Sequence, residues 1–314
     1  MLTIYTNALS HRHDTGFGHP ESAKRLDAAV EGATRAGLAQ NILEDSTGHP
    51  DTGRMIARVH SEDYEKELEE ACQGGFQFFH SLDNPISASS FAAARAAVAT
   101  SLTAAHDIWR ARASKRAFVI VRPPGHHAER VEAMGFCFFN TIACVAEWLR
   151  EQPGIERVFI FDFDVHHGNG TQHVFEQRDD VYYASIHRYP FYPGTGAADE
   201  IGVAAGRGFT LNLPMEAGTG DADYLRATEE RVVRIIDDYR PDAILLSSGF
   251  DAHRRDPLGG MHVSEQAFGE ITRRIVECAE RHCEGRVLSL LEGGYDMEGL
   301  AASVAEHLVA MSGS

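Results

Sequence analysis

Acidic and imidazole side chains alternate with apolar ones in residues 161–170, which read FDFDVHHGNG. The segment follows an apolar run, so it predicts the end of a buried strand that leads into a glycine-rich turn. Because side chains alternate along a strand, Asp162, Asp164 and His166 would share one face, and the intervening Phe and Val residues the other. A solvated strand end would not need aromatic residues between its acids. The pattern therefore favours a metal site.

A third carboxylate could complete this site. Asp251 follows another predicted strand, and Asp164, His166 and Asp251 together would offer two oxygen ligands and one nitrogen ligand. Catalytic zinc sites keep three protein ligands and leave one position for water or substrate. Two anionic ligands neutralise much of the charge of the metal, so such a site would need a separate general base.

Candidate acid–base groups stand at two other predicted strand ends. The adjacent His126 and His127 follow a Pro-Pro-Gly turn. Imidazole titrates near neutral pH, which suits a general base. Asp162 could orient one of these rings as an outer carboxylate. Tyr295 follows two glycines and could donate a hydrogen bond to the oxyanion of a tetrahedral intermediate. Alone, Gly-Gly-Tyr is also typical of a tight turn with an exposed ring.

Apolar strands alternate with helical patterns along the chain, which predicts an α/β fold with a mainly parallel sheet and helices on both faces. The predicted strands are 117–121, 157–163, 181–187, 209–213, 243–248 and 286–291, and the predicted helices are 88–109, 141–150, 223–239 and 264–282. The candidate residues follow the carboxyl ends of these strands, where ligands of parallel sheets bind. No linker or repeat divides the chain, so residues 1–314 are expected to form a single domain.

The composition indicates in which cellular compartment the protein is expected and which classes of partner are disfavoured. The formal net charge is -17, from 29 basic and 46 acidic residues, without the basic stripe of a nucleic-acid binder. The five cysteines have neither disulfide-framework nor zinc-ribbon spacing, which fits reduced thiols. The first residues lack the pattern of a signal peptide, and no run of about 18 apolar residues would span a membrane. We expect a cytoplasmic protein.

Six ordered blocks between Arg122 and Asp296 resemble the zinc-dependent histone deacetylase family, in particular its class II branch, its bacterial amidohydrolase-like members and the related acetylpolyamine amidohydrolases. The blocks read RPPGHHA, GFCFFN, DFDVHHGNGTQ, SIHRYPFYPGTG, SSGFDAHRRDPLGG and LEGGYD. The resemblance implies the single-domain arginase/deacetylase α/β fold, with the site at the carboxyl ends of the strands. Asn169 stands where class I members carry an aspartate, and this is the usual class II choice.

The resemblance also implies a role for each matching residue. Asp164, His166 and Asp251 would hold zinc, with ferrous iron as an alternative. His127 would be the general base, His126 its acid or electrostatic partner supported by Asp162, and Tyr295 would polarise the acetyl carbonyl. The residues expected to bind substrate are Phe136, Tyr192, Gly135, Leu258, Asp83 and Gly294.

Family members also bind structural potassium ions, which implies two further cation sites. The inner site would comprise Asp162, Asp164, His166, Ser185 and Ile186. The outer, backbone-built site would comprise Phe175, Arg178 and Val181.

The implied reaction is removal of an acetyl or short acyl group from lysine side chains of proteins or peptides, with hydroxamates as expected inhibitors. One alternative is hydrolysis of acetylated polyamines. Leu258 stands where some polyamine-specific relatives carry a glutamate, which favours acyl-lysine. An arginase-type ureohydrolase would need further metal-ligand aspartates that the motif does not supply. A non-catalytic acyl-lysine-binding module would not need Tyr295 and both histidines. Oligomers are compatible with the sequence.

Overall fold

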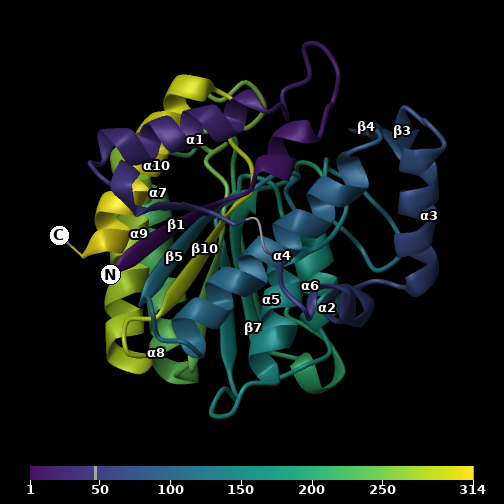
Figure 1. Ribbon diagram of the computed structural model, residues 1–314. Coiled ribbons are helices and arrows are strands. Elements are labelled where there is room, and N and C mark those ends of the chain that lie inside the picture. Colours follow the sequence, from purple (N-terminus) through teal and green to yellow (C-terminus); the bar gives the residue numbers. More distant parts are fainter. Residues whose placement is uncertain (46–47, 314) are drawn as a thin grey trace.

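The computed structural model describes residues 1–45 and 48–313, and its centre is an eight-stranded sheet (Figure 1). The strand order is β2-β1-β5-β10-β9-β6-β7-β8, and every neighbouring pair is parallel. The strands are β1 (Leu2–Thr6), β2 (Ile42–Glu44), β5 (Arg116–Ile120), β6 (Val158–Asp162), β7 (Val181–Arg188), β8 (Thr210–Met215), β9 (Ala243–Ser248) and β10 (Val287–Leu291). A separate antiparallel pair consists of β3 (Phe78–Phe79) and β4 (Ser81–Pro85).

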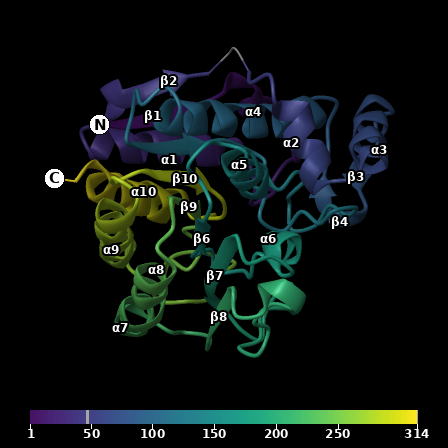
Figure 2. The same ribbon diagram turned by 90° about the horizontal axis from the view of Figure 1, so that it is seen from below.

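Helices cover both faces of the sheet, as the alternation of strands and helices predicts. The helices are α1 (Lys24–Arg35), α2 (Thr52–Val59), α3 (Glu62–Gln73), α4 (Ser90–Trp109), α5 (Thr141–Arg150), α6 (Asn169–Phe175), α7 (Asp221–Ala227), α8 (Arg234–Tyr239), α9 (Glu265–His282) and α10 (Met297–Ser312). Figure 2 shows α9 and α10 on one side of the sheet and α5 on the other.

The apolar core therefore lies in two layers, one on each face of the sheet. Buried side chains of α1, α7, α9 and α10 belong to one hydrophobic cluster, and those of α2, α3, α4 and α5 to the other. Strand residues alternate between these layers. Phe118 and Ile120 pack in the first cluster, whereas Ala117 and Val119 pack in the second. This burial on both faces is why the central strands read as continuous apolar runs.

The predicted strand 157–163 ends at Asp162, so Asp164 and His166 lie in the loop that follows β6. The predicted alternation nevertheless continues past the end of the strand. Phe161, Phe163 and Val165 all pack in the first hydrophobic cluster. The intervening residues Asp162, Asp164 and His166 are thereby held on the opposite side from this cluster.

The loops after β9 and β10 meet at the same edge of the sheet as the loop after β6. The backbone N–H of Glu292 donates to the Ser248 carbonyl (3.0 Å), and that of Phe250 donates to the Gly293 carbonyl (3.1 Å). These bonds hold the two loops together beyond the strands, where the candidate residues lie. Among the described residues, no helix combines the length and the apolar character needed to cross a bilayer.

Candidate metal centre and catalytic pocket

Three predicted ligands converge at the carboxyl ends of β6 and β9. His166 Nδ1 lies 3.1 Å from Asp164 Oδ1 and 3.0 Å from Asp251 Oδ2. The remaining carboxylate oxygens are fixed by the backbone: Gly293 N–H donates to Asp164 Oδ2 (2.8 Å), and Val165 N–H donates to Asp251 Oδ1 (2.8 Å). Each carboxylate therefore directs one oxygen toward the imidazole. The three potential ligand atoms all lie within 4.8 Å of one another.

The electrostatics of this group fit a bound cation. Burial and the neighbouring Asp164 raise the pKa of Asp251 to about 7. Burial acts to raise the pKa of Asp164 as well, but His126 and His166 outweigh it and lower that pKa. Two buried carboxylates so close together repel each other, and a divalent ion would relieve both the repulsion and the burial cost. The oxygen, oxygen and nitrogen donor set is one that zinc accepts.

Glycine at two neighbouring positions leaves room for these carboxylates. A Cβ at Gly249 would lie 2.0 Å from Asp164 Oδ2, and a Cβ at Gly293 would lie 2.2 Å from Asp251 Oδ2. Real Cβ atoms do not approach oxygen so closely, so any other residue would displace a ligand. The positions of Asp164 and Asp251 therefore depend on glycine at residues 249 and 293.

The two adjacent histidines have different partners and different charge states. His126 Nδ1 lies 3.0 Å from Asp162 Oδ2, and His127 Nδ1 lies 2.7 Å from Asn169 Oδ1. Burial acts to lower the pKa of His126, but Asp162 and Asp164 raise it to about 10. Burial, with the neighbouring His126 and His166, holds the pKa of His127 well below its usual value. One ring is therefore cationic and the other neutral.

The hydrogen bonds also assign the tautomer of His127. The Asn169 side-chain nitrogen donates to Glu129 Oε1 (2.5 Å), which leaves Asn169 Oδ1 as the atom that faces the ring. His127 Nδ1 must then carry the proton, and Nε2 is free to accept one. A neutral imidazole with a free Nε2 is suited to act as a general base.

A cavity of about 190 Å³ opens beside the metal ligands. Its lining residues are Asp83, His127, Gly135, Phe136, His166, Phe191, Tyr192, Leu258 and Tyr295. All of the predicted substrate-binding residues except Gly294 are among them. Gly294 instead adopts a left-handed conformation (φ 119°) and its carbonyl accepts a hydrogen bond from Arg25 Nε (2.7 Å).

The Tyr295 ring is held from several sides at the edge of this cavity. The Arg25 guanidinium lies 4.9 Å from the centre of the ring, and Phe136 packs edge-on against it at 5.9 Å. The Tyr295 backbone N–H donates to Asp256 Oδ2 (2.6 Å). Burial raises the pKa of Tyr295 well above its usual value. The phenol is therefore neutral and able to donate a hydrogen bond.

The geometry agrees with the comparisons to known proteins. A family model described as the histone deacetylase domain matches residues 19–311. The chain belongs to the histone deacetylase family. A probable deacetylase of Archaeoglobus fulgidus is 36% identical over 92% of this chain and 79% of its own length. The histone deacetylase-like amidohydrolase of Pseudomonas aeruginosa is 37% identical over 88% of this chain and 71% of its own length.

The fold is that of a histone deacetylase as well. The solved structure described as the HDA15 HD domain superposes with a TM-score of 0.91 at 35% identity, covering 99% of this chain and 88% of that one. The expected arginase/deacetylase α/β fold is therefore confirmed. Family membership makes the chain a hydrolase of the deacetylase and amidohydrolase type.

The residues expected to hold potassium lie in and beside β7. Asp162 pairs with Ser185 across β6 and β7, and the Ser185 hydroxyl lies 2.8 Å from His187 Nδ1. Ile186 is buried in β7, and Phe175, Arg178 and Val181 lie in and after α6, where Arg178 N–H donates to the Phe175 carbonyl (2.9 Å). Both potassium assignments stay predictions.

Several residues of the site were not singled out from the sequence. Phe191 stacks on His166 with the ring centres 5.4 Å apart, and Arg188 lies 3.9 Å above Phe191. Phe191 directly precedes Tyr192 in a recognised block, which is a signal that could have identified it. Glu292 lies behind His126, in the block LEGGYD. Arg25 pairs locally with Glu21, but the carbonyls that connect it to the site, those of Gly294 and Glu292, are about 270 residues away in the chain.

Proposed function

We propose that residues 1–314 act as one catalytic domain, a zinc-dependent amidohydrolase that removes acetyl or another short acyl group from lysine side chains. The observation that carries the proposal is the placement of neutral His127, donor Tyr295 and ligand His166 around one narrow cavity. A general base, an oxyanion donor and a metal ligand are the groups that metal-assisted amide hydrolysis brings together in one place.

Asp164, His166 and Asp251 would hold the zinc ion, with ferrous iron as the alternative. When bound there, the ion supplies Lewis-acid polarisation of the acyl carbonyl and of the attacking water. His127 Nε2 accepts the proton of that water as its oxygen bonds to the carbonyl carbon. Tyr295 donates a hydrogen bond to the resulting oxyanion.

The second half of the reaction uses the same two histidines. His126 is cationic beside Asp162, and it holds positive charge next to the tetrahedral carbon. The carbon–nitrogen bond breaks as the nitrogen accepts a proton from the histidine pair. The products are the free amine and the carboxylate, so the proton taken from water returns to the leaving group.

The cavity walls favour an unbranched alkyl stem. Phe136, Phe191 and Tyr192 present aromatic rings, and Leu258 adds an aliphatic side chain. Such walls would hold the methylene groups of a lysine side chain without hydrogen bonds.

We also propose that the potassium sites inferred from the resemblance stabilise the loops after β6 and α6.

Acetylated polyamines are the second candidate substrate. Asp83 lines the cavity, and its carboxylate could bind a distal ammonium group. The net charge of -17 would also steer a polycation toward the protein. Leu258 offers no such charge, which is why acyl-lysine is preferred here.

The test is a deacetylation assay of the zinc-loaded protein on an acetyl-lysine peptide and on N-acetylated polyamines, with and without a hydroxamate. Hydroxamate-sensitive turnover of the peptide is expected, and a strong polyamine preference would favour the second candidate. Asp251→Asn should abolish turnover and zinc binding at the site of Asp164, His166 and Asp251, whereas exposed Asp238→Asn serves as the matched control. Absence of turnover on both substrate classes, with zinc bound, would contradict the proposal.

A further inference from the structure

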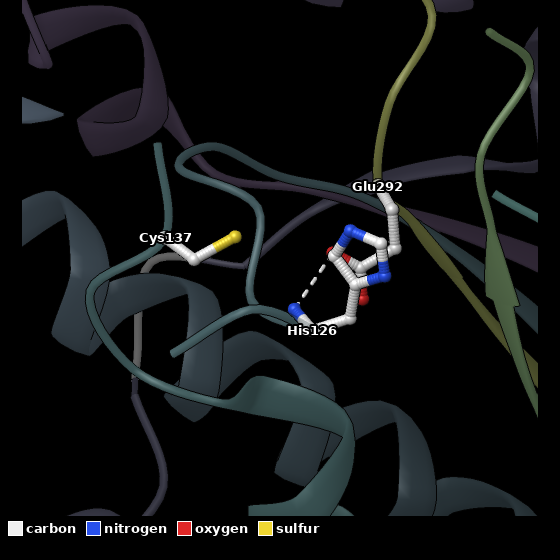
Figure 3. A group of neighbouring side chains, drawn as sticks. All are labelled: His126, Cys137 and Glu292. Carbon is white, nitrogen blue, oxygen red and sulfur yellow. Dashed lines mark hydrogen bonds between the residues drawn. The ribbon is translucent and has the colours of Figure 1, made fainter. Parts of the chain in front are cut away.

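A second group of potential metal ligands lies behind the catalytic histidines (Figure 3). His126, Cys137 and Glu292 are 3%, 0% and 1% exposed, and their ligand atoms lie within 4.8 Å of one another. His126 and Cys137 lie in the long loop between β5 and α5, and Glu292 directly follows β10. Figure 3 shows the Cys137 sulfur pointing toward the His126 ring, with the Glu292 carboxylate beside that ring.

The orientation of His126 suits a metal ligand. Its Nδ1 faces Asp162 Oδ2 at 3.0 Å, which leaves Nε2 as the nitrogen available to an ion. Metal-binding histidines almost always donate their other ring N–H to a carboxylate or a carbonyl, which fixes the ring and makes it a better ligand. Asp162, in turn, accepts a hydrogen bond from the Tyr183 hydroxyl (3.1 Å).

Glu292 is a buried carboxylate held by neutral donors alone. Its Oε2 accepts from the backbone N–H groups of Gly125 (2.7 Å) and His126 (3.3 Å), and its Oε1 accepts from the Ser247 hydroxyl (3.1 Å). In the described part of the chain, no lysine or arginine forms an ion pair with it. The nearby positive charge is that of the His126 imidazolium, which acts to lower the pKa of Glu292 against the larger effect of burial. A bound metal ion would take the place of that charge beside the buried carboxylate.

Cys137 adds a soft ligand. Its thiol is fully buried and donates a weak hydrogen bond to the Gly135 carbonyl (3.3 Å). Sulfur, imidazole nitrogen and carboxylate oxygen together form a donor set that zinc and cadmium accept, whereas magnesium and calcium select oxygen ligands.

We propose that His126 Nε2, Cys137 Sγ and a Glu292 oxygen form a second metal site, which binds a soft divalent ion and inhibits the enzyme. On binding, the Cys137 thiol and the Nε2–H of the His126 imidazolium each release a proton to solvent, and the sulfur and the Nε2 lone pair then bond to the ion. His126 then cannot take part in proton transfer to the leaving amine. The inhibitory role rests on the proposed function, but the binding site does not.

The experiment titrates the metal-free protein with Co²⁺ and records its absorption spectrum. Asp164, His166 and Asp251 contain no sulfur, so a thiolate-to-cobalt charge-transfer band reports on the second site alone. We expect one ion to bind without this band and a second ion to produce it. Absence of the band at saturating Co²⁺ would overturn the proposal.

Three variants assign the band. Cys137→Ser should lose both the band and the second ion, and Glu292→Gln should weaken binding of the second ion. Cys144→Ser, which alters another buried cysteine, is the matched control and should keep both. Asp251→Asn should lose the first ion and keep the band. A charge-transfer band that persists in Cys137→Ser would overturn the proposed site. Parental affinity for the second ion in Glu292→Gln would overturn it as well.

Measurements of turnover then show whether the ion at the second site inhibits the enzyme or only binds to it. With Zn²⁺, turnover should rise as the first ion binds and fall by roughly 10²-fold as the second binds, which is the contribution of a positioned acid–base group. Cys137→Ser should resist that fall. A charge-transfer band without any loss of turnover would overturn the inhibitory role. A band in a protein that never deacylates would refute the proposed function and leave the second metal site standing.

Discussion

The Tyr295 side chain is held in position for its proposed role as a hydrogen-bond donor to the oxyanion. Its ring packs against Phe136 and Arg25, and its phenol stays neutral because burial raises the pKa. We predict that Tyr295→Phe lowers kcat by roughly 10²–10³, the usual cost of losing one oxyanion donor. KM should change little, because the ring and its contacts remain. Tyr239→Phe on α8, whose hydroxyl binds the Asp179 carbonyl, is a control that should keep the parental rate. Near-parental kcat in Tyr295→Phe would remove this residue from the mechanism.

We predict that the amide of Asn169 sets the pH range over which His127, the proposed general base, is neutral. Asn169→Asp would place a carboxylate 2.7 Å from His127 Nδ1 and favour the imidazolium. The acidic limb of the kcat/KM profile should therefore move to higher pH, by about one unit or more. Glu129 contacts the same amide, so the double variant with Glu129→Gln removes the repulsion that the new aspartate would meet. An unchanged acidic limb in both proteins would show that His127 is not the base.

At this scale, the sequence predicted which candidate ligands and histidines would lie together, and their roles stay predictions. The alternation in 161–170 placed Asp164 and His166 on one side, and the structure brings Asp251 to them. Glu292 and Arg25 escaped because their significance depends on partners from distant segments. A carboxylate that binds backbone N–H groups has no pattern of its own in the sequence.

Among the helices, α1 and α10 pack with unusually close backbones. A Cβ at Gly32 would lie 2.7 Å from the Ala301 carbonyl oxygen and 2.8 Å from Val304 Cβ. Gly32→Ala should therefore lower the free energy of unfolding by about 1–3 kcal/mol, despite the higher helix propensity of alanine. Gly53→Ala in α2 is the matched control, because its Cβ would meet only an arginine tip at 3.5 Å. Urea unfolding of both variants measures the difference, and equal stabilities would contradict the packing argument.

The elements that sequence patterns predicted are those with long apolar runs or strong helical periodicity. All six predicted strands are present, and α5 has the predicted limits. The short β1 and β2 were not predicted, since three to five residues do not establish a period. The predicted helix 223–239 is instead α7 and α8 joined by a π-helical turn at Thr228–Val233. Such a local change of hydrogen-bond register leaves the apolar spacing almost unaltered.

For the molecule as a whole, buried neutral histidines make stability depend on pH. His307 is fully buried between the hydroxyls of Thr272 (2.7 Å) and Ser289 (2.9 Å), and burial lowers its pKa to about 3. In the unfolded chain histidine takes up a proton near pH 6.5, whereas in the folded protein His307 does not until about pH 3. Its stabilising contribution is therefore present above pH 6.5 and is lost as the pH falls toward 3.

We predict that His307→Gln reduces this acid sensitivity. Between about pH 7.5 and 5.5, the parent protein should lose about 1 kcal/mol more stability than the variant, because the folded parent keeps one more histidine unprotonated than the folded variant does. Denaturant unfolding at both pH values measures the loss. Equal losses in the two proteins would contradict the prediction, even if the variant is less stable at every pH.

The position of β10 has a consequence for biosynthesis. This strand is the last of the eight along the chain, yet it lies in the middle of the sheet, between β5 and β9. While the ribosome is still translating, the sheet can exist only as two separate pieces, with open edges at β5 and β9. Those edges are unpaired and apolar, so the nascent chain is exposed to aggregation until residue 291 has emerged. Chaperones that shield strand edges would then be needed most in the final moments of synthesis.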